Sequence, residues 1–122
     1  MQFSERLIEL AIQIKSSGVT WNPRPGHYVL DRHSIVERES PFQTGVYFVL
    51  NYPHFVKLAG GEDAFREKLV WLPTFEQTRE LLRSLGVSNQ DQQQWLRRQD
   101  AFTSERELES LYELVLQTQA AQ

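Results

Sequence analysis

Apolar residues near the start of the chain recur with the period of a helix. They form one stripe, which consists of Leu7, Leu10, Ala11 and Ile14. Residues three and four positions apart share one helical face. Ser4 stands before the stripe, where its hydroxyl can accept a hydrogen bond from a backbone N–H as an N-cap. Gly18 follows the stripe, at the position of a left-handed C-terminal residue. The pattern therefore predicts a helix over residues 5–16.

Four later segments have the composition of strands. Residues 27–31 and 34–39 are separated by a short polar link, which predicts a hairpin. Residues 45–50 are apolar at every position after the glycine, as expected for a central strand that is covered on both faces. Pro41 cannot donate to a ladder and marks the loop before this strand. Residues 69–72 predict a further strand, so we expect three or four strands, mostly antiparallel.

The last part of the chain combines capping signals with apolar stripes. Thr74 and Gln77 match a capping box, in which each side chain satisfies a backbone donor of the first turn. Ser88 opens a polar helix, and Ser104 opens a helix with many apolar residues. Residues 53–68 have weaker signals, which predict one short helix that ends at a glycine and then a second helical turn.

The order of these elements predicts an α+β fold, because helices and strands are segregated along the chain and do not alternate. We expect an N-terminal helix, a three- to four-stranded, mostly antiparallel sheet, and C-terminal helices packed on it. The length of 122 residues suits a single domain over 1–122 with its own core. Residues 117–122 have low complexity and are expected to be frayed.

Composition excludes some chemistry and locates the charge. The chain has no cysteine, so disulfides, thiol catalysis and thiolate metal sites are excluded. The net charge is −3, and the acidic excess lies in residues 87–122. No apolar run is long enough to cross a bilayer, and the first residues do not resemble a signal peptide. We therefore expect a cytoplasmic protein that does not bind membranes, and we predict no cofactor.

Two tryptophan motifs carry a resemblance. Trp21 begins a Trp-x-Pro-x-x-Gly segment, and Trp71 begins the segment Trp-Leu-Pro-Thr-x-x-Gln. This pair resembles short uncharacterised bacterial and phage-type proteins. No activity is assigned to that family, so the resemblance implies an independent single domain and transfers no functional residue.

Residues 21–33 are the densest cluster of chemically useful side chains. The candidate ligand-binding residues are Trp21, Arg24, His27, Arg32 and His33. If residues 27–33 formed one unbroken strand, His27, Asp31 and His33 would project from the same face. Such a set can hold zinc with one open position, as in a small metal- or ligand-binding enzyme. However, the residues around His33 fit a hairpin turn better, and we expect no metal site.

A third hypothesis is single-stranded nucleic-acid binding through Arg24, Arg32 and Arg38, because arginines among aromatic residues are typical of stacking surfaces. Glu37 and Glu39 flank Arg38, however, and phosphate contacts need undiluted positive charge. The charge pattern therefore argues against a nucleic-acid partner.

The C-terminal helix carries more apolar residues than one packing face uses. Leu114 and Leu116 lie on the flanks of its main stripe, which indicates a candidate interface with a partner protein or a second copy. No set of catalytic, metal-binding or phosphate-binding residues is complete in the sequence. The leading hypothesis is therefore a non-enzymatic interaction or accessory domain, whose partner is another protein or a second copy in a homodimer. The metal- or ligand-binding enzyme is the alternative.

Overall fold

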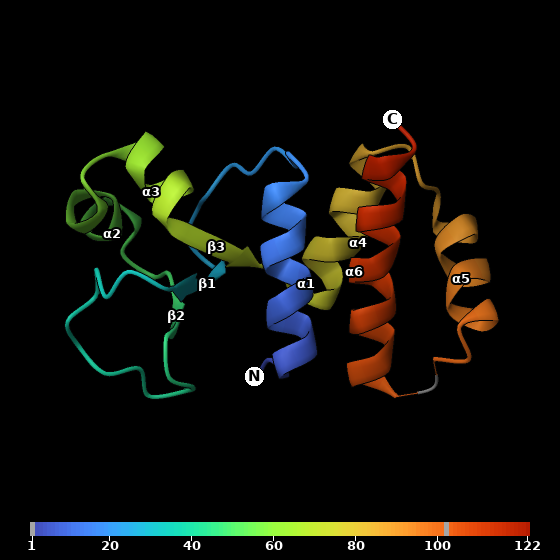
Figure 1. The fold of residues 1–122 in the computed structure, drawn as a ribbon, viewed down its shortest axis with the longest axis horizontal. Coiled ribbons are helices and arrows are strands. Elements are labelled where there is room, and N and C mark those ends of the chain that lie inside the picture. Colours follow the sequence, from blue (N-terminus) through green and yellow to red (C-terminus); the bar gives the residue numbers. More distant parts are fainter. Residues whose placement is uncertain (1, 102) are drawn as a thin grey trace. The chain divides into compact units, whose positions relative to one another are not determined.

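The protein is described by a computed structural model, which covers residues 2–101 and 103–122. Its elements, in chain order, are α1 (Glu5–Ser16), β1 (Tyr28–Asp31), β2 (Val46–Phe48), α2 (Tyr52–Ala59), α3 (Glu62–Lys68), β3 (Leu69–Leu72), α4 (Phe75–Ser84), α5 (Asn89–Arg98) and α6 (Ser104–Ala120). Figure 1 shows this order as a ribbon. The predicted α+β class is confirmed, with an N-terminal helix, a three-stranded antiparallel sheet and C-terminal helices.

The chain divides into two compact units. Unit 1 contains Met1–Phe3 and Thr20–Leu72, and unit 2 contains Ser4–Val19 and Pro73–Gln122. Unit 1 is therefore continuous apart from the first residues, whereas unit 2 is built from two segments that lie far apart in the sequence.

The sheet of unit 1 has the strand order β2-β1-β3, and both pairings are antiparallel. Val29 of the central strand β1 pairs with Tyr47 of β2 on one side and with Trp71 of β3 on the other. The prediction that residues 45–50 form the central strand is wrong, because β2 lies at an edge of the sheet. The predicted strand at 69–72 is confirmed, and it takes the place beside β1 that the sequence assigned to 34–39.

The predicted strand at 34–39 does not form, because the Asp31 side chain binds the backbone that follows it. Asp31 Oδ1 accepts from the N–H groups of His33 (3.1 Å) and Ile35 (3.2 Å), and Oδ2 accepts from that of Val36 (2.8 Å). Ser34 has a φ of 55°. Backbone donors held by a side chain in this way do not join a ladder, so the chain leaves the sheet at Asp31.

Helices α2 and α3 cover the core of unit 1. The Asn51 side chain caps α2 by accepting from His54 N–H, and Gly60 ends it in the left-handed conformation with a φ of 99°. This confirms the predicted glycine-terminated helix and the second short helix after it. The buried residues of this core are Val29, Val49, Ala59, Phe65 and Leu69.

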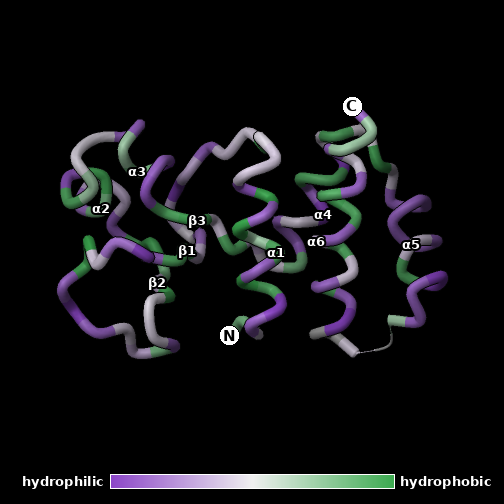
Figure 2. Tube along the Cα trace, in the orientation of Figure 1, coloured by the Kyte–Doolittle hydropathy of each residue, from purple (hydrophilic) through white to green (hydrophobic). Residues whose placement is uncertain are grey.

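Unit 2 is a group of helices arranged around α6, which contacts α1, α4 and α5. Tyr112 of α6 is fully buried, and its hydroxyl donates to Pro73 O at 2.6 Å. Most of α5 is hydrophilic, as Figure 2 shows by its purple colour. Trp95 anchors α5, because its indole N–H donates to Ser110 O of α6 at 2.7 Å.

The capping signals locate most helix starts. Ser4, Thr74 and Ser88 are the N-caps of α1, α4 and α5 as predicted, and Thr74 forms a complete capping box with Gln77. The N-cap of α6 is Thr103, one residue before the predicted serine. Helix α6 continues to Ala120, so it includes most of the segment expected to be frayed.

The two leucines of α6 that the sequence assigns to an interface are buried to different extents within unit 2. Leu114 is only 9 % exposed, and Leu116 is half-buried. The prediction of an interface rests on one packing face for this helix, whereas α6 has three neighbouring helices and buries apolar residues on several sides. Leu114 is therefore a core residue of unit 2.

Candidate functional site

Trp21 and His27 form a packed aromatic cluster with Trp71 of β3. Trp21 Nε1–H donates to His27 Nδ1 at 3.1 Å. The His27 ring stacks on Trp71 with a centroid distance of 5.0 Å and an interplanar angle of 21°. The rings of Trp21 and Trp71 are nearly parallel, at 3° and 6.2 Å. His27 is only 4 % exposed, so the structure places it inside unit 1.

His27 is held neutral by this environment. Its pKa is lowered from 6.5 to about 4, mainly by burial and to a smaller extent by the positive charge of Arg24. The hydrogen bond from Trp21 requires an unprotonated Nδ1, because an imidazolium has no acceptor. At neutral pH, His27 therefore acts as a hydrogen-bond acceptor within the aromatic cluster.

The three residues of the metal hypothesis are not brought together. Asp31 uses its carboxylate to bind backbone N–H groups, and His33 lies exposed beyond the end of β1. Within residues 2–101 and 103–122, no group of three or more His, Asp or Glu side chains has an arrangement that can hold a metal ion. Side chains alternate only along the strand, and β1 ends at Asp31, so His33 does not share a strand face with His27.

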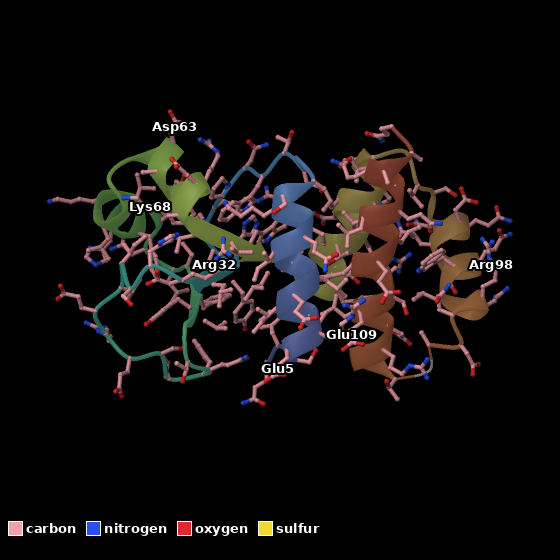
Figure 3. All side chains as sticks on the ribbon, viewed as in Figure 1. Glu5, Arg32, Asp63, Lys68, Arg98 and Glu109 are labelled. Atoms are coloured by element: carbon pink, nitrogen blue, oxygen red, sulfur yellow. The ribbon has the colours of Figure 1, made fainter. Side chains whose placement is uncertain are left out.

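The three arginines of the nucleic-acid hypothesis come from separate loop positions of unit 1. Arg24 and Arg32 are exposed, and Arg32 follows the end of β1 (Figure 3). Arg38 lies between two glutamates in the long loop that leads to β2.

A groove in unit 1 gathers exposed apolar side chains. It has a volume of about 720 Å³ and lies between the loop over residues 35–42, the C-terminal end of β2, and α2. Phe42, Leu50 and Leu58 line it and are 46 %, 74 % and 43 % exposed. These are the exposed large hydrophobic residues of the described chain. Tyr47 and Phe55 also line the groove and pack against the core beneath.

The loop side of the groove is charged. Glu37, Arg38 and Glu39 line it and are exposed, and none of them takes part in an ion pair with another described residue. Tyr47 fixes the loop by donating its hydroxyl hydrogen to Arg38 O at 2.7 Å. Burial raises the pKa of Tyr47, and the negative charges of Asp31 and Glu39 raise the pKa further.

The outer edge of β2 is already occupied by the same loop. Val46 N–H donates to Gln43 O at 2.9 Å, and Val46 O accepts from the Ser40 hydroxyl. Phe3 and Gln43 hold each other through two hydrogen bonds, each of 2.8 Å. The loop therefore closes part of the edge that β2 presents away from β1.

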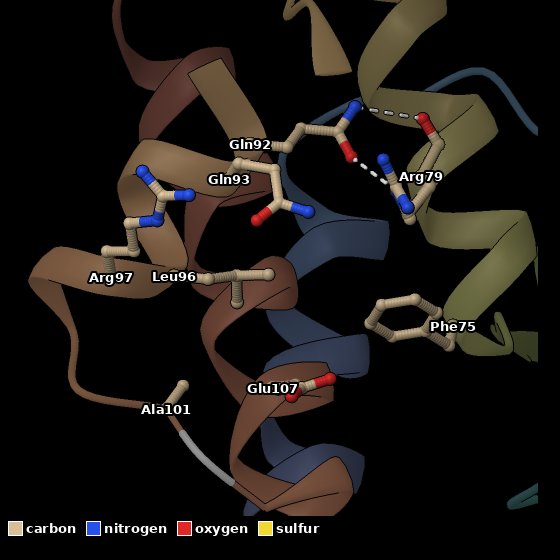
Figure 4. Close-up of a pocket in the computed structure, with 8 residues that line it drawn as sticks. All are labelled: Phe75, Arg79, Gln92, Gln93, Leu96, Arg97, Ala101 and Glu107. Carbon is tan, nitrogen blue, oxygen red and sulfur yellow. Dashed lines mark hydrogen bonds between the residues drawn. The ribbon is translucent and has the colours of Figure 1, made fainter. Parts of the chain in front are cut away.

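Unit 2 has a smaller pocket of about 220 Å³, in which Phe75, Arg79, Gln92 and Glu107 are among the lining residues (Figure 4). Arg79 Nε donates to Gln92 Oε1 at 3.1 Å, and Gln92 Nε2 donates back to Arg79 O at 3.2 Å. The Arg79 guanidinium also lies 5.8 Å from the centre of the Phe75 ring. These polar groups bind each other and connect α4 to α5, which indicates a structural role.

Sequence reasoning missed the groove. Leu50 was assigned to a covered strand, whereas it lies beyond the end of β2 and is mostly exposed. The sequence signal that could indicate the groove lies in α2, because the apolar residues of this helix occupy more than one of its faces. Leu58 is exposed, while Phe55 and Val56 pack on the core.

A comparison with models of protein families found none that matches the chain, and searches of curated proteins and of solved structures found no match either. The resemblance carried by the two tryptophan motifs stays a prediction. Among the described residues, none of the helices has the length and apolar character needed to cross a membrane.

Proposed function

We propose that the protein is a non-enzymatic interaction domain that binds an apolar segment of a partner protein in the groove of unit 1. One observation carries the proposal: the exposed large hydrophobic residues Phe42, Leu50 and Leu58 line the same hollow. Contiguous exposed apolar surface with a polar rim is typical of a binding site. The cytoplasmic location predicted from the sequence remains part of this proposal.

The expected affinity is moderate. Complete burial of a Leu or Phe side chain contributes about 1.5–3 kcal/mol, and the three residues here are already partly covered. Their contribution must offset the loss of translational and rotational freedom and the ordering of the partner segment. Reversible binding, and not obligate assembly, is therefore expected.

The supporting chemistry is that of recognition. The groove combines apolar and aromatic side chains with a few charged groups on one side, as binding pockets commonly do. His27, the residue on which the enzyme alternative depends, is buried and held by Trp21. It does not line the groove.

The test is selection of a random peptide phage library on the wild-type protein, followed by measurement of the selected peptides on Leu50→Asp and Leu58→Asp. A carboxylate in the groove should weaken binding by about tenfold or more, because a buried charge without a partner is costly. Pro25→Asp is the matched control, since it adds the same charge at an exposed site of unit 1 outside the groove. Circular dichroism confirms that each variant is folded. Selected peptides that bind both leucine variants as tightly as the wild type overturn the proposal.

A further inference from the structure

We infer that the segment bound in this groove is an amphipathic helix of a partner protein, with basic residues beside its apolar stripe. The inference rests on the proposed function and adds the conformation and charge of the bound segment. Three features of unit 1 support it: the charge of the groove, the closed edge of β2, and the placement of the exposed apolar side chains.

The charged side chains that line the groove favour a basic partner. Glu37 and Glu39 are exposed and unpaired among the described residues, and Arg38 is the one Lys or Arg among the lining residues. The remaining titratable side chains of the lining are those of Tyr47 and His54. Two carboxylates against one guanidinium leave an acidic loop side, which is complementary to a Lys or Arg placed next to an apolar residue.

The closed edge of β2 argues against a bound strand. The backbone groups of Val46 are bonded to Gln43 and Ser40 of the loop. Tyr47 pairs with Val29 of β1. On the two sides of this pair, Asp31 N–H donates to Gly45 O and Val49 N–H donates to His27 O. By the alternation of an antiparallel ladder, the backbone groups of Tyr47 therefore also point towards β1. An added strand would find only the backbone of Phe48.

An extended peptide depends on main-chain hydrogen bonds to an edge, whereas a helix satisfies its own backbone and binds through side chains. Phe42 lies in the loop, Leu50 follows β2, and Leu58 lies on α2, so three separate segments of unit 1 contribute apolar contacts to the groove. A stripe with apolar residues at positions i, i+4 and i+7 presents such contacts along one face. This arrangement favours a bound helix.

The test uses three synthetic peptides labelled with the same fluorophore. The first has leucines at i, i+4 and i+7 and lysines beside them, the second has glutamates in place of the lysines, and the third is the lysine peptide with a central proline. Fluorescence anisotropy should show that the lysine peptide binds the wild-type protein most tightly. We expect the glutamate peptide to bind about three- to tenfold more weakly, and the proline peptide to lose most of its affinity because proline breaks the helix.

A charge-neutral variant tests the role of the loop side. Glu37→Gln/Glu39→Gln should remove the preference for lysine over glutamate, and high salt should reduce the preference in the wild type. The matched control is Glu67→Gln/Glu80→Gln, which removes two exposed carboxylates outside the groove and should keep the preference.

The outcomes separate this inference from the proposed function. If the three peptides bind equally and Leu50→Asp weakens them all, the groove binds apolar segments but the inference about helix and charge is wrong. If the phage selection succeeds and none of the three peptides binds, the inference is likewise overturned. Sedimentation of the wild type as a dimer that Leu50→Asp dissociates would instead identify a second copy as the occupant. The proposed function is tested by the phage selection. The result of that selection does not depend on which of the three designed peptides binds most tightly.

Discussion

Acidification should destabilise unit 1 through His27. The folded state holds the pKa of His27 at about 4, with burial as the larger cause and Arg24 as the smaller one. In the unfolded chain the pKa returns to 6.5. Between these values the unfolded state binds a proton that the folded state does not, so the free energy of unfolding falls as the pH falls. The stabilisation is complete above pH 6.5 and is lost progressively towards pH 4.

The magnitude follows from the same pKa values. One pKa unit corresponds to about 1.4 kcal/mol, so the full shift corresponds to about 3 kcal/mol. His27 is 4 % exposed, which leaves solvent little room to screen the effect. Protonation of Nδ1 also removes the acceptor for the Trp21 N–H group. The expected loss is a large fraction of the stability of a small unit.

The assay is urea unfolding at a series of pH values between 7.5 and 4, followed by tryptophan fluorescence in a Trp95→Phe background. In that background the remaining tryptophans, Trp21 and Trp71, both belong to unit 1. The slope of stability against pH should approach about 1.4 kcal/mol per pH unit in this range. His27→Gln keeps an acceptor but cannot titrate, and should remove the His27 contribution. His33→Gln, at an exposed histidine, is the control. An identical slope in His27→Gln and in its parent would refute the reasoning.

Two further predictions concern stability. Asp31→Ala should lower the free energy of unfolding in urea by about 1–3 kcal/mol, because it leaves three backbone N–H groups without their acceptor. Arg32→Ala, at the exposed neighbouring residue, should lower it by less than about 0.5 kcal/mol. Equal losses in the two variants would contradict the assigned role of the Asp31 carboxylate. Phe65→Ala should cost about 3–5 kcal/mol, since Phe65 is completely buried. Phe48→Ala should cost clearly less because Phe48 is half-buried; the reverse order would mean that the core of unit 1 is wrongly assigned.

Local signals in the sequence predict the helices well. An N-cap acts within one turn, so Ser4, Thr74 and Ser88 mark their helices wherever the rest of the chain lies. Gly60 similarly marks the end of α2, since its left-handed backbone strongly favours glycine. The α+β class follows from these elements and their order.

Pairing between strands depends on distant residues and is harder to predict. The segment 34–39 has strand composition, but the neighbouring Asp31 carboxylate takes its backbone donors, and β3 pairs with β1 in its place. Strand composition also does not distinguish an edge from a central position, so β2 was assigned wrongly.

The candidate site was less predictable than the fold. The sequence indicates His27 as a candidate ligand-binding residue, whereas in the structure its imidazole accepts a hydrogen bond from Trp21 and stacks on Trp71. The groove depends on which apolar residues remain exposed, and that is decided by tertiary packing. Leu50 and Leu114 show the difficulty in both directions: one was assigned to the core and is exposed, while the other was assigned to an interface and is buried.

The division of unit 2 into two segments has a consequence for synthesis on the ribosome. Helix α1 precedes its neighbour α6 by a long stretch of sequence, so α1 leaves the ribosome well before α6 does. At about 5–20 residues per second, α1 waits several seconds before that neighbour emerges. The residues of unit 1 are all available earlier, so this unit can fold during translation. While its apolar stripe stays uncovered, α1 is accessible to chaperones and to exchange with the α1 of another nascent chain.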